Sequence, residues 1–217
     1  MLLGLFKKDL YGLRYYSLFY LVVYFVVSLL LILMSLGIER EENDPFIFTF
    51  LIFFFSGSIT QGLVLTNLSI DERANFDKFM LSNGVTRNKL FTSKIIFILF
   101  LCGLIAILNF IVFLIFNKFD ILSSLGFLLF NFAYTTFHDF IIFLLTIWLG
   151  GIKSSFVLTI LSFFIVGIGY GVFTLITVFS ANTLTYYLLL YLIPILFILV
   201  SICIVFLTKH LFLKKEY

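Results

Sequence analysis

Six long apolar runs that carry almost no charged residue are the feature that most constrains this chain. They cover residues 16–37, 46–66, 95–116, 121–150, 154–179 and 186–208. Each run exceeds the roughly 20 residues with which a helix crosses a hydrocarbon core of about 30 Å. The longest stretch between two runs, 67–94, is too short for a separate soluble domain. We therefore expect an all-α polytopic membrane protein, with six transmembrane helices and residues 1–217 forming a single membrane domain.

The composition agrees with a membrane protein and excludes a soluble one. Hydrophobic residues make up 63% of the 217 residues and charged residues only 12%, against roughly 45–50% and 25% in soluble domains. Cys102 and Cys203 lie inside apolar runs and are most simply buried small side chains, so the sequence indicates no metal site and no cofactor. The net charge is +3, and the charged residues are distributed according to the membrane spans, so we expect no nucleic-acid partner.

The positions of the basic residues predict the orientation in the membrane. Six spans place both termini on one side, and only Arg40 and Lys118 then lie on the other side. The remaining 12 of the 14 basic residues share the side of the termini. Basic residues accumulate in cytoplasmic loops, so we expect both termini in the cytoplasm. We expect the protein itself to be a multi-pass protein of the plasma membrane.

The first 14 residues have the pattern of an amphipathic helix at the membrane surface. The apolar side chains recur at helical spacing, at Leu2, Phe6, Leu10 and Leu13. Lys7, Lys8 and Asp9 fall outside this stripe. We expect an interfacial helix over residues 1–14 with its lysines toward anionic head groups. The alternative is an ordinary positively charged flank that only sets the topology.

The polar stretch after the second run predicts a short cytoplasmic helix. Ser69 and Glu72 have the spacing of a capping box, which predicts a helix start at Ile70. Asn83 and Gly84 then provide a stop, because glycine tolerates the left-handed conformation at a helix C-terminus. The expected helix therefore covers about residues 70–82.

This expected helix carries a compact apolar patch inside a charged rim. Phe76, Phe79 and Met80 stand at positions i, i+3 and i+4. The candidate residues for contact with a partner are Asp71, Glu72, Arg73, Phe76, Phe79 and Met80. Aromatic anchors within a charged rim are typical of protein interfaces, so one hypothesis is a docking knob for a soluble partner. The other is a surface helix that only shields the loop.

The same stretch resembles a known family. The segment DERANFDKFMLSNGVTRNKLFTSK, residues 71–94, is similar to the loop between spans two and three of type-two ATP-binding-cassette (ABC) export permeases. The small six-span permeases of Gram-positive peptide-antibiotic and peptide-toxin exporters resemble it most. The opening FKKDLYGLR, residues 6–14, is similar to the interfacial helix of that group.

The resemblance implies a function and partners. The chain would be the permease subunit of an exporter, moving an amphipathic or hydrophobic substrate such as a peptide toxin or antimicrobial peptide. Residues 70–82 would be the coupling helix that docks on a separate ATP-binding subunit, and a second permease would complete the core in the lipid bilayer. No GxxxxGK[ST] motif occurs, so we expect no ATPase site and no enzyme activity in this chain. The alternative is a stand-alone immunity or binding protein of the membrane.

An ionisable pair, His138 and Asp139, lies inside the fourth apolar run. Such residues are costly in a membrane unless they face other helices or water. Three interpretations remain open: a proton or cation step, a polar clamp between helices, or a site lifted toward the inner interface. Neighbouring helix positions point about 100° apart, which argues against a compact dyad. Thr135, at i−3 from His138, is the hydroxyl candidate for a nucleophile, and threonine usually bonds its own helix backbone, so intramembrane hydrolysis is disfavoured.

The fifth run contains a GxxxG pair, Gly167 and Gly171. Such pairs let two helices approach closely in a membrane. The seam could join two copies of the chain or two helices of one copy, and the sequence leaves both open.

Overall fold

The computed structural model describes residues 2–16, 19–20, 22–26, 44–116, 121–149, 155–179 and 183–214. Within these ranges every regular element is a helix. The helices are α1 (Leu2–Gly12), α3 (Asp44–Arg73), α4 (Phe76–Ser82), α5 (Arg87–Phe116), α6 (Ile121–Leu149), α7 (Ser155–Phe179) and α8 (Thr183–Lys214). Most of the first expected span, 16–37, lies outside the described residues, and the other five expected spans fall on α3, α5, α6, α7 and α8 in turn.

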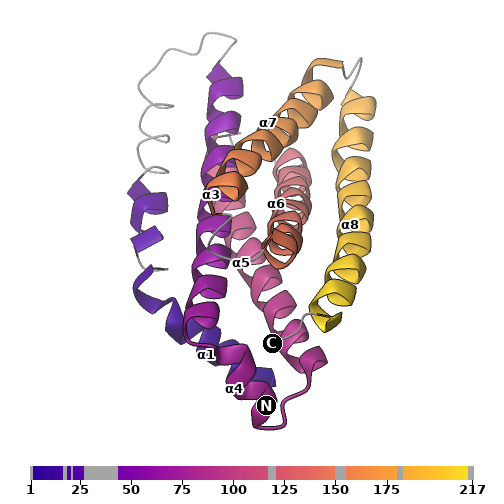
Figure 1. Ribbon diagram of the computed structural model, residues 1–217. Helices are drawn as coiled ribbons and strands as arrows, with labels where there is room; N and C mark the ends of the chain where they lie inside the picture. Colours follow the sequence, from indigo (N-terminus) through magenta and orange to yellow (C-terminus); the bar gives the residue numbers. More distant parts are fainter. Residues whose placement is uncertain are drawn as a thin grey trace.

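Three of the described helices have the length and apolar composition to cross a membrane. They are α5 over Arg87–Ile115, α6 over Ile121–Leu149 and α8 over Thr183–Lys214. Their most apolar windows differ in burial, with 61% of the α6 window inside the bundle against 17% of the α8 window. Helix α6 therefore forms the centre of the bundle, and α8 presents most of its surface outward (Figure 1).

Two short helices, α1 and α4, lie together at one end of the bundle, where α8 also ends (Figure 1). The expected helix start at Ile70 is wrong, because α3 continues to Arg73. The hydroxyl of Ser69 donates to the Thr66 carbonyl within α3 and caps no new helix. The break comes at Asn75, which has a φ of 48°. Asparagine is one of the few non-glycine residues that tolerate this left-handed conformation.

The expected stop of the short helix at Asn83 and Gly84 is confirmed. The amide of Val85 donates to the Met80 carbonyl at 3.0 Å and that of Gly84 to the Leu81 carbonyl at 3.1 Å. This pair of bonds is a Schellman motif, which requires a left-handed residue after the helix. Gly84 supplies it with a φ of 80°.

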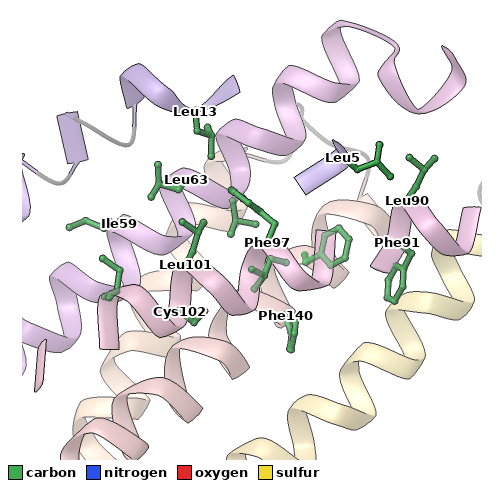
Figure 2. Packing of buried hydrophobic residues seen from close by; sticks show 14 of the residues in the cluster. Leu5, Leu13, Ile59, Leu63, Leu90, Phe91, Phe97, Leu101, Cys102 and Phe140 are labelled. Carbon is green, nitrogen blue, oxygen red and sulfur yellow. The ribbon is translucent and has the colours of Figure 1, made fainter. Parts of the chain in front are cut away.

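Helix α1 is packed against the bundle through one face. Leu5 and Leu13 belong to a buried cluster with α3, α5 and α6, in which Leu63 and Leu101 also point inward (Figure 2). Asp9 lies on this buried face and is 3% exposed, which corrects the expectation that it falls outside the apolar stripe. The expected stripe was displaced because Leu2 is exposed and Leu5 is buried instead.

A second buried cluster surrounds α6, and half of its buried residues are aromatic. The rings of Phe113 and Phe127 stack with centroids 4.0 Å apart, and Phe130 meets Phe173 edge to face at 5.4 Å. Offset-stacked and edge-to-face pairs are the favoured arrangements of aromatic rings. Part of the high phenylalanine content of the chain therefore fixes α5, α6 and α7 to one another.

Candidate functional site

Two groups of polar side chains join helices that are distant in the sequence. The first, which we call the base network, lies where α1, α3, α4 and α5 meet and consists of Lys8, Asp9, Asp71, Asp77 and Lys94. The second, the core cluster, lies between α3, α5, α6 and α7 and consists of Thr60, Cys102, His138, Asp139 and Ser162.

Asp71 is the centre of the base network. One of its carboxylate oxygens pairs with Lys8 of α1 and the other accepts a hydrogen bond of 2.5 Å from Lys94 of α5. Lys94 also lies 3.9 Å from a carboxylate oxygen of Asp77 in α4. Because Asp71 and Lys94 are only 4% and 5% exposed, the charges of the pair are largely withdrawn from water and depend on each other.

Lys8 connects α1 to both α3 and α4. Its ammonium lies 3.1 Å from a carboxylate oxygen of Asp9 and 3.9 Å from the centre of the Phe76 ring. A cation over an aromatic face is attracted by the ring quadrupole. Lys8 therefore holds the aromatic side of α4 while it pairs with Asp71.

Asp9 is the acid of the base network with the least favourable surroundings. Burial raises the pKa of its carboxyl above the ordinary value of 3.8, and the charge of Lys8 opposes this only in part. Ser93 donates a hydrogen bond of 3.5 Å to the carboxyl. The folded protein therefore favours the protonated form of Asp9 more than an unfolded chain does.

The outward face of α4 differs from the expected patch. Of the six residues predicted for partner contact, Glu72, Arg73 and Phe79 are exposed, with Phe79 at 63%. Asp71 is buried in the base network, and Phe76 and Met80 pack against the buried cluster beneath α4. The helix thus presents one aromatic ring among charged side chains.

A further contact joins this end of the bundle to α8. The guanidinium of Arg87, at the first residue of α5, donates a hydrogen bond of 2.5 Å to the Leu213 carbonyl near the end of α8. In addition, Phe91 packs against Phe212 with ring centroids 5.6 Å apart. Helices α1, α3, α4, α5 and α8 are therefore mechanically connected at one end.

In the core cluster, His138 and Asp139 do contact each other. The Nδ1 of His138 lies 2.8 Å from the Oδ1 of Asp139, although the two are neighbours on α6. Their adjacent positions on the helix argued against a compact catalytic dyad, yet the structure brings the two side chains into contact. The other imidazole nitrogen lies 2.8 Å from the hydroxyl oxygen of Ser162 in α7.

Three further groups complete the surroundings of Asp139. The Thr60 hydroxyl donates to its Oδ1 at 3.1 Å and the Cys102 thiol to its Oδ2 at 3.4 Å. His138 and Asp139 are both 0% exposed. The hydrogen bonds of this one pair reach α3, α5 and α7.

Like Thr60, Ser162 is a residue of this cluster that the sequence did not indicate. Its distance of 24 residues from His138 gives no signal in a single helix, because the two residues meet only when α6 and α7 pack. The order serine, histidine, aspartate is that of a hydrolytic triad. Hydrolysis also needs substrate access and oxyanion donors, and Ser162 is 4% exposed in the middle of a helix.

The glycine pair of α7 has open space around it among the residues that the structure describes. A Cβ at Gly167 or Gly171 would meet no atom within 4 Å. Gly169, between them, is the glycine that packs, since a Cβ there would lie 2.3 Å from the Tyr134 ring of α6. The two interpretations of the pair, a seam between two copies and packing within one copy, both stay predictions.

Comparison with known proteins adds the family. Neither a curated protein nor a solved structure matches the chain. The sequence model described as "ABC-2 family transporter protein" matches residues 4–211, from α1 to α8. Members of this family are membrane components of ABC transporters and leave ATP hydrolysis to another subunit. The chain belongs to the ABC-2 transporter family and is a permease subunit that works in the cell membrane with an ATP-binding partner.

Proposed function

We infer that this permease is part of an exporter and that its ATP-binding subunit docks on the outward face of α4. The observation that carries this inference is the exposed ring of Phe79 on a helix that is held from beneath by the contact of Asp77 with Lys94. An exposed aromatic ring costs little in the free chain and gains most when a partner groove desolvates it. The exposed Glu72, Arg73 and Lys78 form the polar rim of the same face.

The orientation rests on charge. The described helices place the basic residues of α1, α4 and the start of α5 at one end of the bundle, together with the end of α8 (Figure 1). This end is cytoplasmic by the positive-inside rule. With six spans, both termini are then cytoplasmic, which is the side on which an ATP-binding subunit meets its nucleotide.

The mechanism follows from the connections beneath α4. A push on α4 reaches α5 through the contact of Asp77 with Lys94. It continues to α3 through the buried pair of Lys94 and Asp71, whose charges separate only at high cost. Arg87 passes the same displacement to α8. ATP-driven motion at the base would thereby tilt the helices that surround α6.

The substrate and the second permease are inferred from the family resemblance of the sequence. An amphipathic or hydrophobic substrate, such as a peptide toxin or antimicrobial peptide, follows from the resemblance of the loop at 71–94 to peptide-exporter permeases. A second copy would complete the transport path. Family membership favours the permease over the alternative of a stand-alone immunity or binding protein.

The test is association between the full chain and its ATP-binding subunit in detergent. Phe79→Ala should weaken association by about tenfold or more, as for a central aromatic anchor. Phe206→Ala on α8 is the matched control, since Phe206 is 68% exposed but lies on a lipid-facing helix, and it should leave association unchanged. Equal affinity of both variants and the parent would refute docking on α4.

The charged rim offers a second arm of the same test. Glu72→Lys and Arg73→Glu should change association and its salt dependence, because rim charges steer encounters. Asp71 and Phe76 are poor choices here, since both hold α4 in place and their replacement would disturb the fold. An effect of the rim variants that persists at high salt would contradict an electrostatic role.

A further inference from the structure

The outward face of α1 serves neither the docking on α4 nor the transmission of force through the base network. Along α1 and the residues that follow it, five exposed side chains recur at helical spacing, and we call them the α1 face: Leu3, Lys7, Tyr11, Arg14 and Tyr15. Leu3, Tyr11 and Tyr15 are 66%, 70% and 72% exposed. The α1 face is therefore open to whatever surrounds this end of the bundle.

Contacts with α5 fix the depth of α1 in the membrane. Asp9 accepts a hydrogen bond of 3.5 Å from Ser93, and the next residue, Lys94, is the last charged residue before the apolar run of α5. Inside that run, the ring of Phe100 meets the ring of Phe6 edge to face, with centroids 5.4 Å apart. Helix α1, next to α4 at the base of the bundle (Figure 1), therefore lies where charged residues give way to apolar ones. In a membrane this level is the boundary between head groups and hydrocarbon.

The chemistry of the α1 face suits that boundary. Tyrosine places its ring at the apolar side of the head-group layer and its hydroxyl at the wet side. Lys7 and Arg14 supply the charges of the face. Asp9 is the one acid in residues 2–16, and it is turned into the bundle and 3% exposed. Lys8 is committed to the base network. The α1 face is therefore aromatic, and its charge is entirely positive.

The two cations of the face lie on one stripe. The guanidinium of Arg14 is 4.6 Å from the centre of the Tyr15 ring, a contact that holds it beside an interfacial aromatic. A guanidinium pairs with a phosphate through parallel N–H bonds, and an ammonium pairs with it as a point charge. Lys7 precedes Arg14 by about two helical turns, or roughly 10 Å. Each cation can therefore meet a different head group.

We propose that the α1 face binds anionic phospholipids of the adjacent leaflet, with Lys7 and Arg14 on lipid phosphates and the tyrosines in the head-group layer. Its charge selects this partner, because a basic face at the boundary is complementary to head groups of net negative charge. A protein that approaches from water would have to displace lipid to reach a face at this depth. Each basic residue near an anionic surface strengthens binding about fivefold, so the pair should favour anionic lipid by about 25-fold.

Native mass spectrometry of the full chain in detergent measures this preference. Phosphatidylglycerol and phosphatidylcholine with identical acyl chains are titrated separately, and the ratio of their dissociation constants for the first bound lipid gives the selectivity. The parent should prefer phosphatidylglycerol by about 25-fold at low salt, and by less at high salt, because salt screens exposed charges. Lys7→Gln/Arg14→Gln should bring the ratio close to one, and each single variant should bring it to about fivefold.

Three variants serve as controls. Arg73→Gln/Lys78→Gln removes the same charge from exposed positions at the end of α3 and on α4, and it should keep the parent's ratio. Lys7→Arg/Arg14→Lys exchanges the two cations and should also keep most of the ratio. Tyr11→Ala should weaken both lipids alike and leave the ratio unchanged, because the ring carries no net charge.

A parent ratio close to one would overturn the proposal, because the α1 face would then not select lipid by charge. An unchanged ratio in Lys7→Gln/Arg14→Gln would place the anionic lipid elsewhere on the chain. If that variant also lost association with the ATP-binding subunit, the face would belong to the protein partner instead. An equal drop in Arg73→Gln/Lys78→Gln would reduce the preference to the net charge of the chain.

Discussion

The base network and the core cluster both fasten α3 to α5, but they balance charge in opposite ways. The base network sets Lys8 and Lys94 against three aspartates, and the Lys8 side chain is 28% exposed. The core cluster has one acid and one imidazole, both 0% exposed. Water therefore reaches part of the base network, whereas the ionisable side chains of the core cluster are shielded from it.

This difference separates the two regions by role. Charges at the base are stable, paired and close to the proposed docking face, so they suit the transmission of force. The core cluster is buried, and its hydrogen bonds cross from α6 to other helices, so they hold only while α6 stays packed. The variants below test whether each region depends on charge, on packing or on protonation.

The largest expected effect is at the centre of the base network. Asp71→Asn should lower the free energy of unfolding by about 3 kcal/mol, because it leaves the buried Lys94 without its nearest carboxylate. The control is Glu72→Gln, one residue away and exposed, which should cost less than about 0.5 kcal/mol. Denaturation in mixed detergent measures both. Equal effects of the two variants would mean that burial of the ion pair contributes nothing.

Packing beside the core cluster gives the next effect. Gly169→Ala places a Cβ 2.3 Å from the Tyr134 ring and should destabilise the chain by about 1–3 kcal/mol through overpacking. Gly167→Ala, on the same helix with no atom within 4 Å, should be neutral or slightly stabilising, since alanine favours helices. Thermal unfolding of both variants measures this difference in stability. A stable Gly169→Ala chain would contradict the close approach of α6 and α7.

The smallest effect is at Asp9 and depends on pH. Burial raises the pKa of its carboxyl, so the folded chain keeps the proton to higher pH than the unfolded chain. Stability should therefore fall as pH rises from about 4 through the folded-state pKa, and the loss persists at neutral pH. Asp9→Asn removes that fall and should be as stable as the parent at pH 7, or more stable by up to about 1 kcal/mol. A variant clearly less stable at pH 7 would show that pairing with Lys8 outweighs burial.

The helices and the turn at Gly84 could be predicted because local sequence determines them. Apolar runs longer than a membrane span have few alternatives to a helix, and the left-handed residue after α4 calls for glycine. The predicted position of the break between α3 and α4 was wrong because it also relied on local sequence spacing. Ser69 and Glu72 have capping-box spacing, but Ser69 bonds backward to Thr66, and the tolerance of Asn75 for a positive φ decides the break.

The contacts between helices could not be predicted, since they depend on packing rather than spacing. Nothing in residues 1–14 indicates that Asp9 faces Ser93, or that Lys8 reaches Asp71. Ser162 meets His138 only across two helices. The apolar patch of α4 was predicted as one surface, yet the bundle withdraws Phe76 and Met80 and leaves Phe79 outside.

The central claim, that the ATP-binding subunit docks on α4, is tested most directly by photocrosslinking in the assembled transporter. A benzoylphenylalanine at position 79 should crosslink to that subunit in membranes. The same group at Leu184, 71% exposed at the opposite end of α8, should not. No crosslink from position 79, or an equal one from position 184, would contradict both the docking face and the orientation of the chain.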